Sequence, residues 1–499
     1  MNAHSMTRLD TGLGWREVAA IAAGNRLTLS EGALLRVERA RTIVEAIIEK
    51  GIRGYGINTG VGALCDEVID RRDQQQLSRN ILLSHSCGVG PILGREETRA
   101  IMAAQIANLA HGYSGIRPQT LLALTALLNA DSLPQIPSKG SVGYLTHAAA
   151  IGLVLIGEGS ALADGRIISG HEAMRRVGLD PIILEAKEGL ILANGTPCAT
   201  GLASLALARL ERLLGWADSA AALTYEMLGA QNNPFAAAPL ALRKSAGIEK
   251  TGQRLRGLLD GSELLASSAG SRTQDPLSLR AVPQIHGAIH DLHSDVGRVV
   301  DRELASVTDN PVVVGTPEHP EVHSQAHAVG AALGLAMDSL GVAAAELAAI
   351  SERRIDRLVN PLVSGLPAFL AEPGGMSSGF MIIQYTAASL VAENRRLAAP
   401  ASLDGGITSA LQEDMLTHAT PAADKALAIL ANLETVIAIE LLAAAQAYEM
   451  KPGKERADGT AALQSQIRKI APVYRDDQPL NQLVLAVRDF IAQHPSPAT

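Results

Sequence analysis

The sequence has 499 residues and a net charge of −8 at pH 7; 47% of its residues are hydrophobic, but only 3% are aromatic. This length exceeds what a single core usually organises, so we expect one large domain or two to three packed regions. Charges of both signs are spread along the chain without a basic stripe, which argues against nucleic acid as the main partner. The core must be built mostly from small and branched aliphatic side chains.

The first 170 residues predict helices separated by glycine-rich loops. Residues 15–50 follow a helical pattern, with Ser30 as the N-cap and Gly51 as the C-terminal stop of its last part. The next stretch, GIRGYGINTGVGALCDEV, has too many glycines for a helix, so we expect a loop that holds Tyr55. Helical spacing returns over 74–132, interrupted at 86–91, and residues 133–170 combine a loop, an apolar helix and a turn.

Three longer stretches, 198–230, 325–361 and 420–450, carry aliphatic residues at three- and four-residue spacings with few helix breakers. Small residues on such helices let neighbouring helices approach closely. The chain is therefore predicted to be mainly α-helical. We expect an N-terminal loop-rich helical region over 1–196 and a bundle of long helices over 197–499.

The cysteine content and the hydropathy pattern predict a soluble, cytoplasmic protein. The three cysteines are odd in number and match no metal or disulfide spacing, which favours a reduced compartment. The N-terminal residues show no apolar segment typical of a secretory signal. The longest charge-free runs look too short or too polar for a bilayer span, so no membrane association is expected.

Several loops carry polar residues beside helix ends, where functional side chains often lie. Taken in order, the motifs are YGINTGVG (55–62), NILLSHSCGVGP (80–91), KGSVG (139–143), LVLIGEG (153–159), LANGT (192–196), QDPLSLRAVPQIHG (274–287), SERRI (351–355), SSGFMIIQYTAASLVAEN (377–394) and QED (412–414). Their order and spacing resemble the histidine and aromatic amino acid ammonia-lyase family over nearly the whole chain. The resemblance implies an ammonia-lyase/fumarase-like fold, an elongated bundle of long helices. It also implies a homotetramer whose active sites draw loops from more than one subunit.

The chain departs from this family directly after Gly143. The family has Ala-Ser-Gly-Asp-Leu at this point, and the Ala-Ser-Gly triad cyclises into an electrophilic methylidene-imidazolone group. Here Gly143 is followed by Tyr144 and Leu145, so three residues are missing and Tyr144 takes the place of the Asp. The chain has no residues nearby from which to build the group, and no cofactor is expected.

The missing electrophile governs the expected reaction. An α-amino group leaves readily only if it stays cationic, and the family ensures its departure by bonding it covalently. A trimethylammonium group is permanently cationic, so the sequence predicts β-elimination of trimethylamine from an imidazole-bearing betaine. The resemblance is then to the ergothionase branch, which converts ergothioneine to thiolurocanate; hercynine is a related substrate. The alternatives are an ammonia-lyase for histidine or an aromatic amino acid, and an inactive member that serves in binding or assembly.

The family motifs imply two catalytic residues and an anchor for the substrate carboxylate. Tyr55 matches the tyrosine that removes the β-proton, and its pKa, about 10 when unperturbed, would have to fall for this role. Glu413 matches an active-site glutamate that would face the imidazole ring or balance the substrate's cationic charge. Arg280 matches the arginine that grips the carboxylate with its planar fork. Without the motifs, Tyr55 would be interpreted as an anchor of its loop, Glu413 as a carboxylate at a helix N-terminus, and Arg280 as an ion-pair partner.

Four further substrate-binding candidates rest on the same resemblance. His85 matches a histidine that contacts imidazole substrates, and Asn194 matches an active-site asparagine, although Asn-Gly is also a common turn pair. Gln274 is a weaker candidate. Tyr144 could offer an aromatic face to a cationic nitrogen, or could simply fill space.

Two departures, at Leu277 and Ala328, replace residues that are often Tyr and Phe in the family and suggest an altered substrate. His286, His290 and His293 share one helical face, but without a matching carboxylate pattern no metal site is expected.

Overall fold

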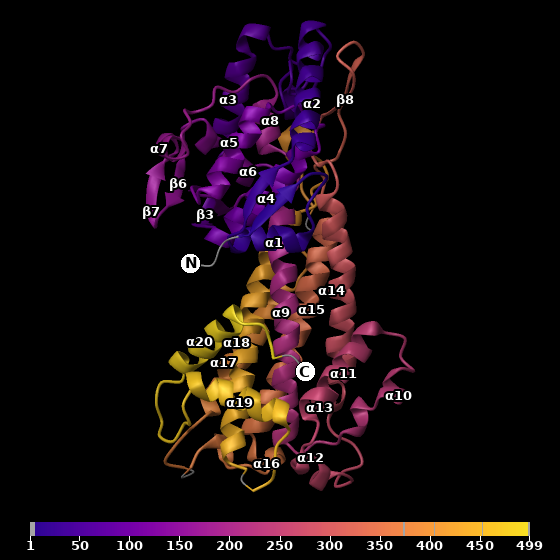
Figure 1. Cartoon of the computed structure of the whole chain (residues 1–499), viewed down its shortest axis with the longest axis vertical. Helices are drawn as coiled ribbons and strands as arrows, with labels where there is room; N and C mark the ends of the chain where they lie inside the picture. Colours follow the sequence, from indigo (N-terminus) through magenta and orange to yellow (C-terminus); the bar gives the residue numbers. More distant parts are fainter. Residues whose placement is uncertain (1–4, 373–374, 404, 452, 498–499) are drawn as a thin grey trace. The chain divides into compact units, whose positions relative to one another are not determined.

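A computed structural model describes residues 5–372, 375–403, 405–451 and 453–497, and helices dominate it (Figure 1). The helices are α1 Trp15–Ala23, α2 Glu31–Glu49, α3 Gln74–His85, α4 Arg95–Ala110, α5 Pro118–Asn129, α6 His147–Leu155, α7 Gly170–Arg176, α8 Glu188–Ala193, α9 Pro197–Met227, α10 Ala237–Leu240, α11 Ala246–Leu259, α12 Glu263–Ser268, α13 Leu277–Arg280, α14 Val282–Leu304, α15 Ala331–Val359, α16 Pro361–Ser364, α17 Met381–Leu397, α18 Ala419–Glu449, α19 Asp458–Ile470 and α20 Asn481–Gln493. The mainly α-helical fold class is confirmed.

The helix expected over 15–50 is divided. Gly24, with φ +133°, ends α1, and the strand β2 (Arg26–Leu29) follows and pairs in parallel with β1 (Met6–Leu9). The second part begins as predicted, because the Ser30 hydroxyl accepts a hydrogen bond from the Ala33 N–H at 3.0 Å. Helical periodicity alone did not show the break, since a four-residue strand carries too few positions to reveal its own period.

Short antiparallel pairings fix the loops of the N-terminal region. β3 (Val89–Ile92) pairs with β5 (Pro137–Lys139), which places the segment after α3 beside the start of the KGSVG loop. β4 (Leu133–Pro134), β6 (Ser160–Ala163) and β7 (Arg166–Ser169) form a three-stranded sheet, and β8 (Val312–Gly315) pairs with β9 (Pro320–His323). The β3–β5 and β4–β6 pairings join separated segments of the chain, whereas β6–β7 and β8–β9 are hairpins.

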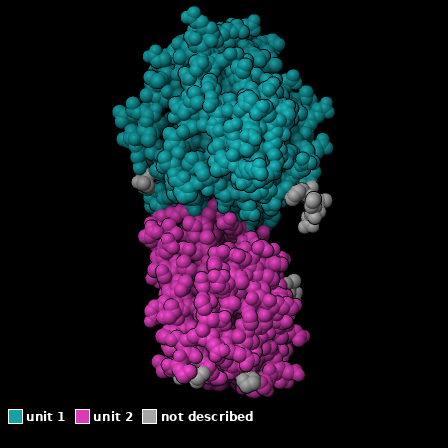
Figure 2. Space-filling model, turned by 90° about the vertical axis from the view of Figure 1, so that its left-hand side faces the viewer, with its two compact units in different colours: residues 1–208, 296–338, 400–424 teal, residues 209–295, 339–399, 425–499 magenta. Residues whose placement is uncertain are grey.

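The chain forms two compact units, each built from three separate segments (Figure 2). Unit 1 comprises residues 1–208, 296–338 and 400–424, and unit 2 comprises residues 209–295, 339–399 and 425–499. The long helices α9, α14, α15 and α18 each have residues in both units.

A buried charge pair joins the long helices α15 and α18 within unit 2. The Arg354 guanidinium on α15 donates to both carboxylate oxygens of Glu440 on α18, at 2.6 and 2.8 Å, and both side chains are fully buried. Thr224 on α9 and Ser351 also donate their hydroxyls to Glu440. Removing one partner of a buried charge pair leaves the other charge buried and unpaired, which is costly, so this cluster fixes how the three helices meet.

The stretches Glu188–Met227, Ala331–Val359 and Ala419–Glu449 are long and apolar enough to span a bilayer, contrary to the expectation from charge-free runs. Their most apolar windows are 100%, 72% and 72% buried within the protein. Burial inside the fold therefore accounts for most of this apolar surface.

Candidate active site

Tyr55 lies in the glycine-rich loop that follows α2, in unit 1. Its hydroxyl accepts a hydrogen bond from the Gly62 N–H at 2.8 Å, which closes the loop around the side chain. The turn that begins at Tyr55 needs glycine at position 56, where φ is +61° and a Cβ would lie 2.3 Å from Cδ2 of Leu190 on α8. The loop is therefore packed directly against the helix that leads to Asn194.

The shortened KGSVG loop contains a rare backbone turn immediately after Tyr144. Leu145 and Thr146 have φ angles of 63° and 65°. The His147 N–H donates to the Leu145 carbonyl at 2.8 Å across Thr146, whose ψ is −70°, so these residues form a strained γ-turn. Strain at a bulky residue persists only where the surroundings impose it, and it concentrates at functional sites.

Glu413 is presented by a second strained loop. Ser409, Ala410 and Leu411 all have positive φ angles, between 50° and 75°. Thr408 and Glu413 exchange two backbone hydrogen bonds that close the loop at its base. The Ser409 hydroxyl accepts from the Ala63 N–H at 3.2 Å, so this loop is tied to the loop that carries Tyr55.

These loops bring Tyr55, Tyr144 and Glu413 into one cluster. The Tyr144 hydroxyl donates to Oε2 of Glu413 at 3.1 Å, although the two residues are 269 positions apart. The body of Tyr144 is only 6% exposed and packs against Ala328 and Leu416. Burial raises the pKa of Tyr144, and so do the charge of Glu413, their hydrogen bond and the neighbouring Tyr55. Tyr144 is therefore a neutral hydrogen-bond donor to Glu413.

The electrostatic setting of Tyr55 differs from the expectation of a lowered pKa. Burial raises the pKa of Tyr55; the Gly62 N–H opposes this, while the charges of Glu413 and Cys65 raise it further. No cationic side chain contributes to this balance among the described residues. Tyr55 is thus a neutral phenol before substrate binds, and any positive charge that activates it has to arrive from outside this set of residues.

The side-chain amide of Asn194 has a defined orientation. Asn194 follows α8, and its Nδ2 donates to the Asn310 carbonyl at 2.9 Å and to Oδ1 of Asp309 at 3.4 Å. Both partners accept hydrogen bonds, so they select the NH2 side of the amide and leave Oδ1 for another group. Asp309 is itself held by a buried ion pair with Lys187 at 2.9 Å.

Sequence reasoning did not identify Asp309, Asn310 or Lys187 as supports of this site. The polar stretch TDNPVV (308–313) beside a helix end was the available signal. Lys187 gave none, because its burial becomes visible only once the fold is known.

The other sequence-predicted residues are divided between the two units, with His85 in unit 1 and Gln274 and Arg280 in unit 2. His85 is the last residue of α3; its Nδ1 lies 3.0 Å from the Ser84 hydroxyl, and burial lowers its pKa. Gln274 and Arg280 belong to unit 2, where Gln274 is exposed. Arg280 Nε donates to the Asp275 carbonyl at 2.9 Å, and within the described chain its two terminal nitrogens make no hydrogen bond. That end of the guanidinium is available to a carboxylate.

The two departures from the family pattern have different surroundings. Ala328 contributes to the wall around Tyr144, whereas Leu277 begins α13 in unit 2 and is exposed. His147 begins α6, and burial lowers its pKa.

A metal site does not emerge from the histidines of α14. His286 Nδ1 lies 2.7 Å from Oδ1 of Asp218 on α9. Across the ranges that the structure describes, no group of three or more His, Cys, Asp or Glu residues is arranged to hold a metal ion.

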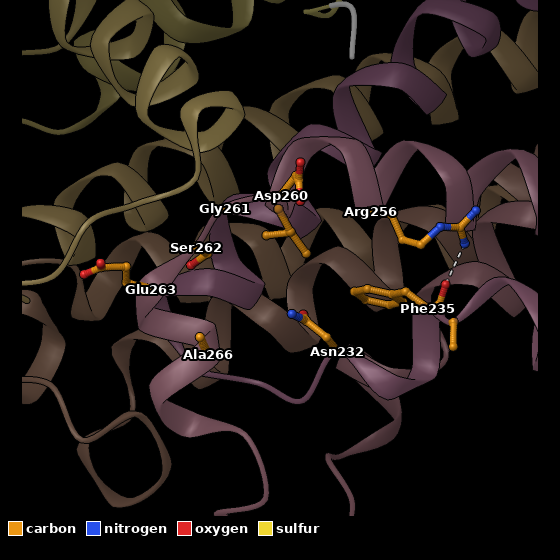
Figure 3. A pocket seen from close by; sticks show the side chains of 10 residues that line it. Asn232, Phe235, Arg256, Asp260, Gly261, Ser262, Glu263 and Ala266 are labelled. Carbon is orange, nitrogen blue, oxygen red and sulfur yellow. Dashed lines mark hydrogen bonds between the residues drawn. The ribbon is translucent and has the colours of Figure 1, made fainter.

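A separate cavity of about 510 Å³ lies in unit 2 (Figure 3). It is lined by Asn232, Phe235, Ala236, Arg256, Leu259, Asp260, Gly261, Ser262, Glu263 and Ala266. Arg256 donates to the Phe235 carbonyl at 2.6 Å, so its charge is partly engaged by backbone. None of the sequence-predicted site residues lines this cavity.

The aromatic amino acid lyase family model matches residues 13–469. The chain belongs to this family. It is 45% identical to the histidine ammonia-lyase of Symbiobacterium thermophilum over 92% of this chain and 91% of that protein. It is 43% identical to the histidine ammonia-lyase of Anaeromyxobacter sp. (strain K) over 95% and 96% of the two chains. The family resemblance inferred from the motifs is confirmed, and the protein is a carbon–nitrogen lyase by family.

Solved structures agree with this assignment. The histidine ammonia-lyase of Trypanosoma cruzi superimposes with a TM-score of 0.90 at 34% identity, covering 98% of this chain and 93% of that one. Ergothionase from Treponema denticola, in complex with desmethyl-ergothioneine sulfonic acid, gives a TM-score of 0.91 at 28% identity, covering 98% and 99%. The fold is therefore shared by both activities and does not by itself choose between them.

The expected elimination of trimethylamine from ergothioneine or hercynine is wrong. Eight relatives at 41–45% identity are histidine ammonia-lyases, and these matches span most of the chain. The expectation rested on one shortened loop. The identity to histidine ammonia-lyases, in contrast, extends over 89–95% of the chain.

The methylidene-imidazolone group of the family does not fit this loop. The chain passes directly from Gly143 to Tyr144, without the residues that cyclise. The space is also occupied: a Cβ on Gly143 would lie 3.1 Å from the Ala419 nitrogen, and the Tyr144 side chain packs against Ala328 and Leu416. No step of the reaction is therefore assigned to that group.

Proposed function

We propose that this protein eliminates ammonia from L-histidine, giving the α,β-unsaturated imidazole acid. The observation that carries the proposal is the 41–45% identity to histidine ammonia-lyases across about nine-tenths of the chain. The cluster of Tyr55, Tyr144 and Glu413 supports it, because two strained loops hold a phenol and a carboxylate where a substrate could contact both.

Five of the candidate residues have the following roles in this proposal. Tyr55 accepts the β-proton once substrate has lowered its pKa. Arg280 binds the substrate carboxylate with its free terminal nitrogens. His85 contacts the imidazole ring, with Gln274 as a further polar contact. Asn194 presents Oδ1 to a donor on the substrate, since its NH2 group is already bound.

The proposed assembly is a cytoplasmic homotetramer that acts on a small molecule, without nucleic acid or membrane partners. We propose that a neighbouring copy supplies part of each active site, as the family resemblance implies. Exposed apolar residues along α15, including Leu335 and Val342, support a contact between copies.

The test is incubation of the purified protein with histidine, following ammonia release and the ultraviolet absorbance of the unsaturated product. Ergothioneine and hercynine are run in parallel. We expect ammonia and product in equal amounts from histidine. Release of trimethylamine from either betaine, with histidine untouched, would overturn the proposal.

A second candidate is a binding protein without lyase activity, which the missing electrophile favours. Histidine binding without product would support this second function and contradict the first.

A further inference from the structure

Elimination of ammonia without an electrophile has a specific chemical requirement. The amine has to stay protonated while the Cβ–H bond is broken, because amide ion is a far poorer leaving group than ammonia. A phenolate strong enough to remove the β-proton would also take the ammonium proton. The site therefore has to hold the cation more firmly than water does.

The polar end of Tyr144 lies where such a cation could be held. Its phenolic hydrogen is directed to Glu413, so the lone pairs of the oxygen remain available as acceptors. Glu413 adds carboxylate oxygens on a loop that is only partly buried, open to a ligand. Ala328 and Leu416 cover the body of the ring, and apolar surroundings strengthen charge interactions at its polar end.

We propose that Tyr144 and Glu413 form an acceptor site for the substrate ammonium, which keeps the amine cationic until it departs. This inference rests on the proposed histidine elimination. It assigns to Tyr144, at the point where the electrophile-forming triad is missing, a non-covalent role in amine release. Tyr144 and Glu413 touch the substrate but form no bond to it.

The step balances without any further reactant. After substrate binds, the Tyr55 phenol loses its proton to solvent. The resulting phenolate takes the proton from Cβ, and the C–H electron pair becomes the Cα–Cβ double bond. The C–N bond breaks, and its electron pair leaves with nitrogen, so R–NH3+ releases neutral NH3. The ammonium beside Glu413 would also bring positive charge near Tyr55, which lowers the pKa of a phenol. This is the charge that the protein itself does not supply among its described residues.

The test compares the binding of two probes that differ only in the amine: L-histidine and 3-(imidazol-4-yl)propionate. Binding is measured by calorimetry on the full-length protein in a Tyr55→Phe background, so that no probe is consumed. Tyr144→Phe and Glu413→Gln should each weaken histidine binding about 10- to 100-fold, the range for hydrogen bonds that involve a charged group. Binding of the propionate should change by less than about threefold, because it makes no amine contact.

Matched controls are available in unit 1. Tyr113→Phe removes a partly exposed phenol, and Glu172→Gln removes an exposed carboxylate on α7; neither residue is part of the site. Both should leave the binding of the two probes unchanged. If Tyr144→Phe does not fold, as judged by its circular dichroism spectrum, Glu413→Gln decides the question, because that side chain is not part of the packed core.

Equal weakening of both probes, or no weakening of either, would overturn the ammonium site. The result is separable from the proposed function. Amine-selective binding that depends on Tyr144, without any product from the protein that retains Tyr55, would uphold the ammonium site and reject the lyase activity. Product formation from histidine, together with unchanged amine selectivity in Tyr144→Phe and Glu413→Gln, would uphold the lyase activity and reject the ammonium site.

Discussion

At the scale of single residues, Tyr55 carries the hydroxyl assigned to proton removal. Tyr55→Phe keeps the ring but removes the base, and general-base catalysis contributes about 100- to 10,000-fold. We expect the elimination rate at saturating histidine to fall by about that factor, while calorimetric binding of 3-(imidazol-4-yl)propionate stays within about threefold. Tyr113→Phe is the matched control. A variant that retains a tenth or more of the rate would remove Tyr55 from this role.

The pH dependence of the reaction follows from the raised pKa of Tyr55. Burial, Glu413 and Cys65 together keep the phenol protonated at neutral pH, so only a small fraction of the free enzyme is phenolate. Because kcat/KM reports the free enzyme, it should rise about tenfold per pH unit between about pH 7 and 8. In contrast, kcat should level off at lower pH, since bound ammonium lowers the pKa of Tyr55.

Glu413→Gln removes one of the charges that raise this pKa and should move the kcat/KM profile to lower pH. Its overall rate should fall at the same time. A kcat/KM plateau below about pH 7 in the unmodified protein would contradict a raised pKa of Tyr55 in the free enzyme.

The sequence carried part of this residue-level picture. Tyr55 and Glu413 stand in motifs that marked them as candidates, and the absence of the cyclising triad could be counted directly. The hydrogen bond between Tyr144 and Glu413 joins residues 269 positions apart, and no local pattern predicts such a pair. The raised pKa of Tyr55 was hidden for the same reason, because it depends on burial and on neighbours from distant loops.

At the scale of elements, α8 and α3 approach each other so closely that only glycine fits at position 189. A Cβ there would lie 2.0 Å from the Ser78 carbonyl oxygen. Gly189→Ala must push α8 away from α3, which costs about 1–3 kcal/mol or more of unfolding free energy. Asn194 ends the same helix, so the KM for histidine should rise as well.

Denaturant unfolding and steady-state kinetics would measure these two effects. Gly405→Ala is the control, because a Cβ at that position meets no atom within 4 Å. Unchanged stability together with unchanged KM in Gly189→Ala would show that α3 and α8 do not position Asn194.

Helix prediction from the sequence succeeded where the apolar pattern was long. α9, α15 and α18 lie within about three residues of the predicted stretches, apart from the start of α15. The first helical region was divided because Gly24 and four strand residues interrupt it, a feature set by pairing with β1. The γ-turn at Thr146 was equally beyond prediction, since it results from fitting a shortened loop between fixed ends.

At the scale of the whole molecule, the motif order predicted a family and a fold that the comparisons confirm. The segments of the chain that make up each unit were not predicted from the sequence. Unit 1 combines residues 1–208 with two later segments, and such assembly depends on contacts between distant segments. The contact between copies is harder still to predict from the sequence, but substitutions on the exposed face of α15 test it directly.

Leu335 and Val342 lie seven residues apart on α15, on one face of the helix, with exposed fractions of 57% and 48%. Other positions of the same helix are buried in the core, so α15 has apolar residues on two sides. If a second copy covers the exposed side, Val342→Arg places an unpaired charge in that contact, and symmetry repeats it in every copy. We expect the sedimentation mass to fall below that of the proposed tetramer. If a neighbouring copy supplies part of the active site, as proposed, elimination of ammonia from histidine should fall with the mass.

Ile167→Arg on β7 is the control, since this residue is 67% exposed on a short strand of unit 1 and should leave both mass and rate unchanged. The two readouts separate assembly from local damage. A Val342→Arg protein that keeps its mass but loses activity would mean that α15 acts within one copy. A protein that dissociates yet retains its full rate would mean that each chain carries a complete active site, with Tyr55 and Arg280 serving the same substrate molecule.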